Sequence, residues 1–314
     1  MAVSFNSAAL LNGNGIDISS VVKAILAPQN ASINLLQNQQ TDLSTQAGLL
    51  EGLNNDLTNL AAAVLSLASV SGPLTAQSAT SSQPDILTAT AQTTAPPGTH
   101  QIVVSSLATT GTVYTDPLTN GNTSFLTDGA TTGDVKLQVG GAKGTVHDIA
   151  ITAGSNDTLS TLASYINAQK WGVTANVVTD ASGARLALTS QATGTPGALA
   201  ITKNTTGLAF NPPTGGTNAS LTIDGVPFSS ATNTLTGAIA GVTLNLASAA
   251  PATSVQLTVG PDAVQATNAI NSFVTAYNAV INGINTQFTV DPTTNSEGPL
   301  GSDSALRTPA IQFA

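Results

Sequence analysis

The most regular hydrophobic pattern of the chain lies between residues 33 and 68. One row of large apolar residues recurs there at a step of seven: Leu36, Leu43, Leu50, Leu57 and Val64. A second row lies three residues further on in the later heptads, at Leu53, Leu60 and Leu67. These two rows predict one long helix whose seam packs against other helices in a coiled-coil-like manner. The Ser-Gly-Pro triplet at residues 71–73 is typical of a helix end.

A second helical pattern begins after residue 261. Its apolar residues step by three and four: Ile270, Phe273, Tyr277, Val280 and Ile284. We expect this helix, near residues 262–288, to pack against the apolar rows of the first one. Because the two helices flank a long β-rich stretch, they predict a discontinuous helical stalk made of residues 28–73 and 261–314. A further helix start at residues 302–303, so close to the last residue, leads us to expect a C-terminally truncated chain.

The N-terminal region, residues 1–27, is predicted to be a flexible leg. It is rich in small and polar residues up to Gly15, and Pro28 is expected to interrupt the short helix that follows. Asp17 or Ser19 is a suitable N-cap for that helix. Its apolar and capping residues, which we expect a partner to order, are Ile16, Asp17, Ile18, Val21, Val22 and Ile25.

Between the two helical regions the hydrophobic period changes to two, as expected of half-buried strands. Polar, Gly-rich loops at residues 115–133 and 211–216 divide this stretch. They predict two nested, mainly antiparallel β modules: an inner one from residues 74–112 and 217–260, and an outer one from residues 113–216. The outer module should contain one short helix at residues 158–169. The expected fold class is therefore α+β and multidomain.

The composition excludes several classes of function. Charged residues make up only 7% of the 314 residues, the net charge is −9, and cysteine is absent. An acidic chain with seven Lys and Arg residues is a poor partner for nucleic acid. No apolar run is long enough for a membrane span, and the N-terminus lacks the pattern of a cleavable secretory signal. Such a chain suits an appendage protein that is exported unfolded.

Candidate chemical sites are few. His100 and His147 are the only histidines, and no Gly-x-Ser-x-Gly motif surrounds a serine. Two isolated histidines and scattered aspartates are equally poor metal ligands, and the Asp-Gly pairs read as hairpin turns. We therefore expect no catalytic residue, metal or cofactor. Trp171, the only tryptophan, is expected to anchor a core, with a role in surface adhesion as the alternative.

Several stretches together resemble a known family. GNGIDISSVVKAILAPQNASINLLQNQQTDL, at residues 13–43, is similar to the N-terminal region of flagellar hook-associated protein 2, the filament cap protein. Residues 158–194 resemble the Ile-Asn module that cap proteins share with flagellins, through Ile166-Asn167 and Gly172-Val173 among others. Residues 221–246, VQLTVGPD, FVTAYNAV and GPLGSDSALR resemble the start of the C-terminal region of the cap proteins. The family continues past the last of these stretches into further C-terminal helices.

The resemblance implies an extracellular protein at the tip of the flagellar filament. It implies a homo-oligomeric ring, commonly pentameric, that retains exported flagellin and promotes its folding and insertion into the filament. It also implies that the N-terminal residues Ile16 to Ile25 dock on the filament or on a neighbouring subunit. A contact with the hook-filament junction protein is a further implied partnership. The alternative is a surface adhesin whose outer β module binds host or matrix ligands.

Overall fold

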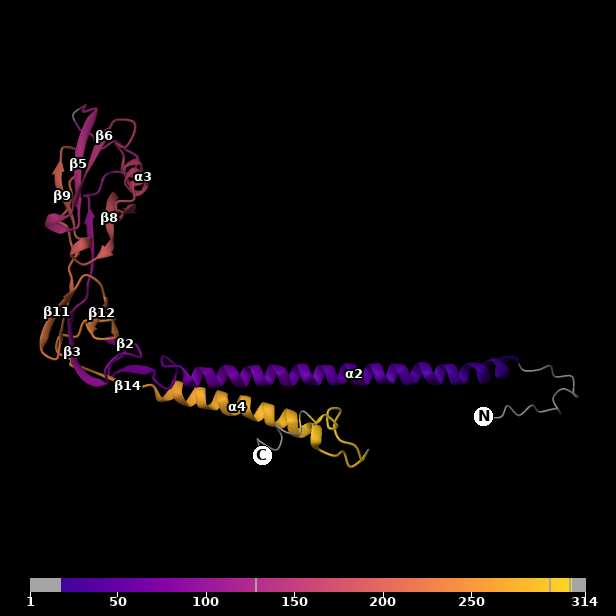
Figure 1. Ribbon diagram of the computed structural model, residues 1–314. Helices are drawn as coiled ribbons and strands as arrows, with labels where there is room; N and C mark the ends of the chain where they lie inside the picture. The colour runs from indigo at the N-terminus through magenta and orange to yellow at the C-terminus, as the bar shows by residue number, and fades with distance from the viewer. Residues whose placement is uncertain (1–17, 128, 294, 305, 307–314) are drawn as a thin grey trace, which may run out of the picture. The chain divides into compact units, whose positions relative to one another are not determined.

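The computed structural model describes residues 18–127, 129–293, 295–304 and 306 (Figure 1). The chain forms two compact units. One consists of the residues up to Leu74 together with those from Ala263 onwards, and the other is Thr75–Asp262. The first is helical and the second is built of antiparallel strands, so the expected α+β class is confirmed.

The helical unit is a pair of helices, α2 and α4. Helix α2 spans Ile18–Ala68 and α4 spans Ala263–Phe288. At about 1.5 Å per residue, α2 is roughly 75 Å long. The two helices pack in opposite directions, because Leu53 lies beside Gly283 whereas Ala63 shares a groove with Asn268. No helix in the described ranges is long and apolar enough to cross a lipid bilayer.

The course of α2 corrects the prediction for the N-terminal leg. The helix runs without interruption through Pro28, so residues 18–27 belong to α2 and the predicted interruption at Pro28 is wrong. A proline inside a helix removes one backbone hydrogen bond and costs about 3 kcal/mol. The helix tolerates this local penalty because the forty residues after Pro28 form one continuous helical ladder.

The β-rich unit contains two cores. The first lies among strands from both ends of the unit and includes Leu87, Ile102, Leu221, Leu244 and Leu257. A five-stranded sheet has the order β1-β14-β3-β10-β11, and a three-stranded sheet has the order β12-β13-β2. The strands are β1 (Gln77–Ser81), β2 (Leu87–Ala91), β3 (Gly98–Ser106), β10 (Ala219–Ile223), β11 (Val226–Ser230), β12 (Thr234–Ile239), β13 (Val242–Leu246) and β14 (Val255–Pro261).

A second, separate core lies among two further sheets and one helix. The sheet orders are β4-β8-β7 and β6-β5-β9, and helix α3 packs on β7 and β8. The elements are β4 (Thr110–Tyr114), β5 (Thr132–Val139), β6 (Thr145–Thr152), α3 (Leu159–Gln169), β7 (Val173–Asp180), β8 (Gly183–Thr193) and β9 (Leu199–Asn204), with 3-10 turns η1 (Gly141–Lys143) and η2 (Thr195–Gly197). All strand neighbours in both halves are antiparallel.

The chain enters and leaves each of these core regions through neighbouring residues. Gln77 on β1 is paired with Pro261 on β14, and the Asp262 N–H donates to the Ala76 carbonyl at 2.8 Å. The passage to the second core is similar, because the Thr109 N–H donates to the Thr217 carbonyl at 3.0 Å. The second core therefore begins near Thr109, and β4 starts before the boundary that the sequence placed at residue 113.

Candidate assembly surfaces and local clamps

The face of α2 that packs on α4 is not the row that the sequence pointed to. The less exposed residues of α2 step by three and four: Gln46, Leu49, Leu53, Asp56, Leu60, Ala63 and Leu67. On α4, Val280 and Ile284 are buried and Phe273 and Tyr277 are half-buried, whereas Ile270 is 48% exposed. The contact therefore uses the second row of α2, with Leu53, Leu60 and Leu67.

The predicted seam row is exposed. Between 45% and 66% of the surface of each of its members is accessible: Leu36, Leu43, Leu50, Leu57 and Val64. The prediction that both apolar rows of α2 face α4 is therefore wrong for this row, whereas the second row does face α4. Two adjacent apolar rows satisfy the same spacing rule, and Gly283 of α4 lies against Leu53 of the other row, where it has no side chain to keep the helices apart.

The exposed rows of the two helices lie on one side of the pair. Successive helical residues are rotated by about 100°, so the Leu36–Val64 row lies about a quarter-turn from the face that meets α4. On α4, the exposed Ile270 and Val274 lie about a quarter-turn from its contact face in the same rotational sense. Because the helices run in opposite directions, equal offsets point to the same side. We name this composite surface the apolar side of the helix pair.

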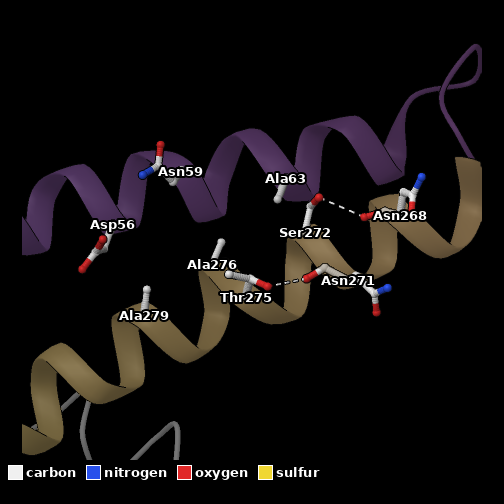
Figure 2. Close-up of a pocket in the computed structure, with 9 residues that line it drawn as sticks. All are labelled: Asp56, Asn59, Ala63, Asn268, Asn271, Ser272, Thr275, Ala276 and Ala279. Atoms are coloured by element: carbon white, nitrogen blue, oxygen red, sulfur yellow. Dashed lines mark hydrogen bonds between the residues drawn. The ribbon is translucent and has the colours of Figure 1, made fainter.

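The opposite side of the pair is polar. A groove of about 750 Å³ between α2 and α4 is lined there by amide, hydroxyl and small side chains (Figure 2). Asn59 and Asp56 come from α2, and Asn268, Asn271 and Thr275 come from α4. The helix pair thus presents two chemically different surfaces, of which only the apolar one should gain much by being covered.

The residues assigned to the N-terminal leg are only partly visible. Ile16 and Asp17 lie outside the described residues, and the side chains of Ile18 and Val21 do too. Val22 is 45% exposed and Ile25 is 62% exposed on the first turns of α2. Their role in docking stays a prediction.

The sequence reasoning missed a polar clamp at the end of α4. Gln287 is only 6% exposed, and its side-chain oxygen accepts from the Leu300 N–H at 3.3 Å. Its backbone carbonyl accepts from the Gly298 N–H at 2.9 Å. From α2, Gln46 donates to the Pro299 carbonyl at 3.0 Å. The Gly-Pro-Leu-Gly segment at residues 298–301 is thereby attached to both helices. These hydrogen bonds explain why polar Gln46 and Gln287 lie on helix faces that are otherwise apolar.

In the second core, the Ile166-Asn167 pair joins α3 to β7. Ile166 is 1% exposed and packs in the core. The Asn167 amide donates to the Ala175 carbonyl and its oxygen accepts from the Ala175 N–H, both at 2.8 Å. Thr158 caps the helix by accepting from the Thr161 N–H. Strand β7 is the edge strand of the β4-β8-β7 sheet and has no neighbouring strand on its outer side. The side chain of Asn167 supplies there the hydrogen-bond donor and acceptor that a neighbouring strand would otherwise supply.

The two histidines have separate structural partners. His100 Nδ1 lies 2.7 Å from Asp224 Oδ2, and Asp224 Oδ1 accepts from the Gln101 N–H at 2.8 Å. These hydrogen bonds, led by that of His100, hold the pKa of the Asp224 carboxyl below its usual range. His147 is stacked on Trp171, with ring centroids 4.4 Å apart. Neither arrangement brings a serine hydroxyl to a histidine among the hydrogen bonds of the described residues.

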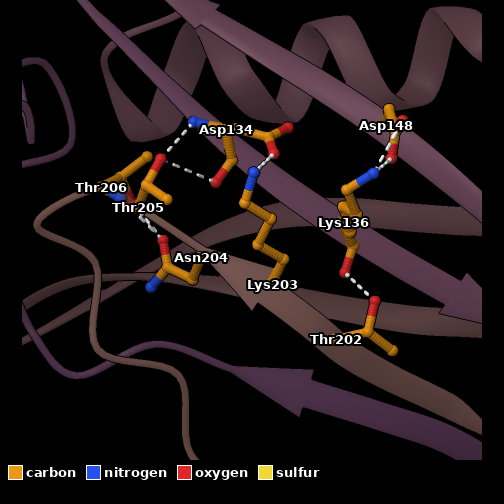
Figure 3. Close-up of polar contacts among 8 residues, drawn as sticks. All are labelled: Asp134, Lys136, Asp148, Thr202, Lys203, Asn204, Thr205 and Thr206. Carbon is orange, nitrogen blue, oxygen red and sulfur yellow. Dashed lines mark hydrogen bonds and ion pairs between the residues drawn. The ribbon is translucent and has the colours of Figure 1, made fainter.

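Two ion pairs cross the outer face of the β6-β5-β9 sheet (Figure 3). Lys136 pairs with Asp148 at 2.8 Å, and Lys203 pairs with Asp134 at 2.8 Å. The hydrogen bond to Asp148 raises the pKa of Lys136. Exposed pairs of this kind contribute about 0–1 kcal/mol each, so they add little to the stability of the sheet.

Comparison with known proteins matches three family models in order along the chain. Residues 14–111 match "Flagellar hook-associated protein 2 N-terminus", residues 127–192 match "Flagellin hook IN motif", and residues 216–312 match "Flagellar hook-associated protein 2 C-terminus". The two models of the same protein together cover more than half of the chain. The chain belongs to the flagellar hook-associated protein 2 family.

Relatives within the flagellar hook-associated protein 2 family are moderately similar. The B-type flagellar hook-associated protein 2 of Pseudomonas aeruginosa is 30% identical over 252 residues, which are 72% of this chain and 52% of that protein. The flagellar hook-associated protein 2 of Escherichia coli K12 is 29% identical over 325 residues, 96% of this chain and 68% of that protein. The chain thus spans about half to two thirds of the length of these relatives.

Solved structures of the family agree in fold. The D1-D2-D3 domains of the flagellar cap protein FliD from Escherichia coli match with a TM-score of 0.64 at 27% identity, over 84% of this chain and 75% of that one. FliD (HAP2) from Pseudomonas aeruginosa PAO1 matches with a TM-score of 0.52 at 27% identity, over 66% of this chain and 98% of that one. The Ile-Asn clamp lies inside the matched hook IN motif, so its hydrogen bonds give that motif a physical basis.

Proposed function

We propose that this protein is a flagellar filament cap protein. It assembles with copies of itself into a ring of five at the extracellular tip of the filament. There it retains exported flagellin and promotes its folding and its insertion into the growing filament. The observation that supports this most is the order of the three family matches along one chain, with α2 in the N-terminal match and α4 in the C-terminal match.

We assign assembly to the helical unit. The apolar side of the helix pair exposes large residues that gain roughly 1.5–3 kcal/mol each when fully buried, so an uncovered surface of this kind is costly. In the proposal, this side is covered in the assembled cap. Val22 and Ile25 extend that surface along the first turns of α2. In the proposal, the N-terminal residues named above, Ile16, Asp17, Ile18, Val21, Val22 and Ile25, contact the filament. A contact with the hook-filament junction protein would use the same end of the helix.

The β-rich unit is proposed to consist of an inner and an outer module. Support comes from the two separate cores and from the paired strands at which the chain passes from one core to the next. Such modules suit a rigid platform over the point where flagellin emerges, because they carry many hydroxyl and amide side chains and few charges. The proposal assigns no catalytic role to any residue.

Deletion of the gene tests the proposal directly. Cells that lack a cap should release unpolymerised flagellin into the medium and carry no filaments, and the intact gene should restore filament growth. A gene with Leu43→Gln and Leu57→Gln on the apolar side should fail to restore it, whereas Asn59→Gln and Asn268→Gln on the polar side should succeed. Normal filaments in the deletion strain would contradict the proposed function, and equal rescue by both double variants would contradict the assigned surface.

A further inference from the structure

The second core region carries a groove at the edge of its β6-β5-β9 sheet. Strand β9 is the last strand of that sheet, and the chain turns back after it and runs along β4 as residues 209–214. A groove of about 380 Å³ lies between β9 and this returning segment. Its lining includes Ile201 from β9 and Leu208, Phe210, Pro212 and Pro213 from the returning segment.

One wall of the groove is an unpaired strand edge formed by the returning segment. The Asn211 N–H donates to the Tyr114 carbonyl, and the Ala209 carbonyl accepts from the Asp116 N–H, both at 2.8 Å. Backbone groups alternate in direction along an extended strand. The N–H and carbonyl of Phe210, between these two residues, therefore point away from β4 and towards the groove.

The opposite wall is the free edge of β9. Gly140 donates from its N–H to the Ala198 carbonyl at 2.9 Å, which fixes the alternation of hydrogen-bonded pairs between β5 and β9. In that alternation Ala200 is bonded to β5 through its pair with Gln138, and the backbone groups of Ile201 point away from β5. Among the described residues, no backbone hydrogen bond outside the sheet ladders involves Ile201 or Phe210.

Over residues 209–213 the returning segment does not form a ladder with β9, although it meets the start of that strand further on, where Gly216 lies against Ala198. Pro212 and Pro213 have no N–H group, so this part of the segment cannot form a ladder with β9. The lining also holds no charged residue, and its polar side chains, Asn204 and Asn211, are already hydrogen-bonded to the Leu208 carbonyl and to Asp116. The groove thus offers backbone hydrogen bonds on two sides and apolar side-chain contacts within.

We infer that this groove binds an extended, uncharged polypeptide segment, which inserts as an additional strand between β9 and residues 209–211. Strand addition of this kind draws its affinity from main-chain hydrogen bonds and its selectivity from pockets for alternate side chains. Ile201 and Phe210 favour apolar side chains, and charged side chains are disfavoured because nothing in the lining would neutralise them. The inference concerns the β-rich unit alone and does not depend on cap formation.

The test measures binding of an uncharged seven-residue peptide of alternating Val and Thr to the full chain by fluorescence anisotropy. Phe210→Ser should weaken binding at least tenfold, whereas Tyr114→Ser, an exposed aromatic on β4 outside the lining, should leave it unchanged. Thermal unfolding of each variant establishes that the fold is intact. No binding at millimolar peptide, or equal effects of the two variants, would overturn the inference.

N-methylation of the peptide separates strand insertion from other modes of binding. Methyl groups on the odd or on the even amides each remove the donors that one wall requires. If the peptide pairs with both walls, both methylated forms should bind at least tenfold more weakly. Loss with only one of them would show addition to a single edge, and loss with neither would show side-chain binding, and each result would overturn insertion between the two walls. Replacing the Val residues with Lys should also abolish binding.

Discussion

The Ile-Asn clamp makes a quantitative prediction. Asn167→Ala removes the two hydrogen bonds that join α3 to the backbone of Ala175, a residue that is only 2% exposed. Each backbone group left without a partner costs about 1–3 kcal/mol when buried. The alanine returns about 0.6 kcal/mol through its helix propensity, and water reaches the exposed side of Asn167. We expect a net loss of about 2–4 kcal/mol.

The assay uses the only tryptophan of the chain. Trp171 follows α3 and packs against the second core, so its fluorescence reports unfolding of this region in urea. With an m-value of about 1–3 kcal/mol/M in urea, the midpoint should fall by at least about 0.7 M. Asn176→Ala, an exposed asparagine on β7, serves as the control and should shift the midpoint by less than about 0.3 M. An equally small shift for Asn167→Ala would refute the argument.

A second substitution tests the direction of each hydrogen bond. Asn167→Asp keeps the acceptor for the Ala175 N–H but places a carboxylate oxygen next to the Ala175 carbonyl. At pH 7 this variant should be at least as unstable as Asn167→Ala. Below the pKa of the new carboxyl, the protonated group can donate again, so its deficit relative to the natural chain at the same pH should shrink. A deficit that does not depend on pH would contradict the assigned bond directions.

Three further predictions concern other parts of the chain. Leu60→Ala on the α4-facing row should lower the free energy of unfolding of the helix pair by about 1–2 kcal/mol, whereas Leu57→Ala on the exposed row should change it by less than about 0.5 kcal/mol. Equal effects of the two variants in thermal unfolding followed by circular dichroism would contradict the assignment of the two rows. Asp224→Asn should remove the stability that the ionised Asp224 carboxylate contributes above about pH 4, its pKa in the unfolded chain. The natural chain loses the same stability as the pH falls through the lowered pKa of Asp224 in the folded chain, so the urea midpoints of the two chains should converge in acid. Pro28→Ala should strengthen the first turns of α2 by up to about 3 kcal/mol, measured as slower amide hydrogen exchange near residues 24–28, and unchanged exchange would contradict a continuous helix there.

Much of the fold could be predicted from hydrophobic periodicity. The seven-residue step of Leu36–Val64 predicted a long helix, and alternation predicted strands such as β3 and β13, because burial on one face imposes those periods. Strand β1, with the polar sequence QSATS, carries no such pattern and was missed. It is a strand because it pairs along β14, and a pairing between residues so far apart in the chain leaves no local signature.

The surfaces were harder to predict than the elements. Periodicity identified the apolar residues of α2, but it could not decide which of two adjacent rows meets α4, since that choice depends on the small residues of the partner. Pro28 shows the converse limit, because a local rule against proline was overridden by the rest of the helix. The clamps of Gln287 and Asn167 depend on backbone groups distant in the sequence, which no pattern along one strand or helix reveals.

The paired strands at which the chain enters and leaves the β-rich unit have a mechanical consequence. If the two helices were pulled apart, the tension would reach this unit at Gln77 and Pro261, which lie opposite each other on β1 and β14. The force would act on the terminal residue pair of the β1–β14 ladder and would have to break the hydrogen bonds of this ladder one after another. Until that ladder opened, neither core would carry the force. The β1–β14 ladder is therefore the part of this unit that would yield first under such a load.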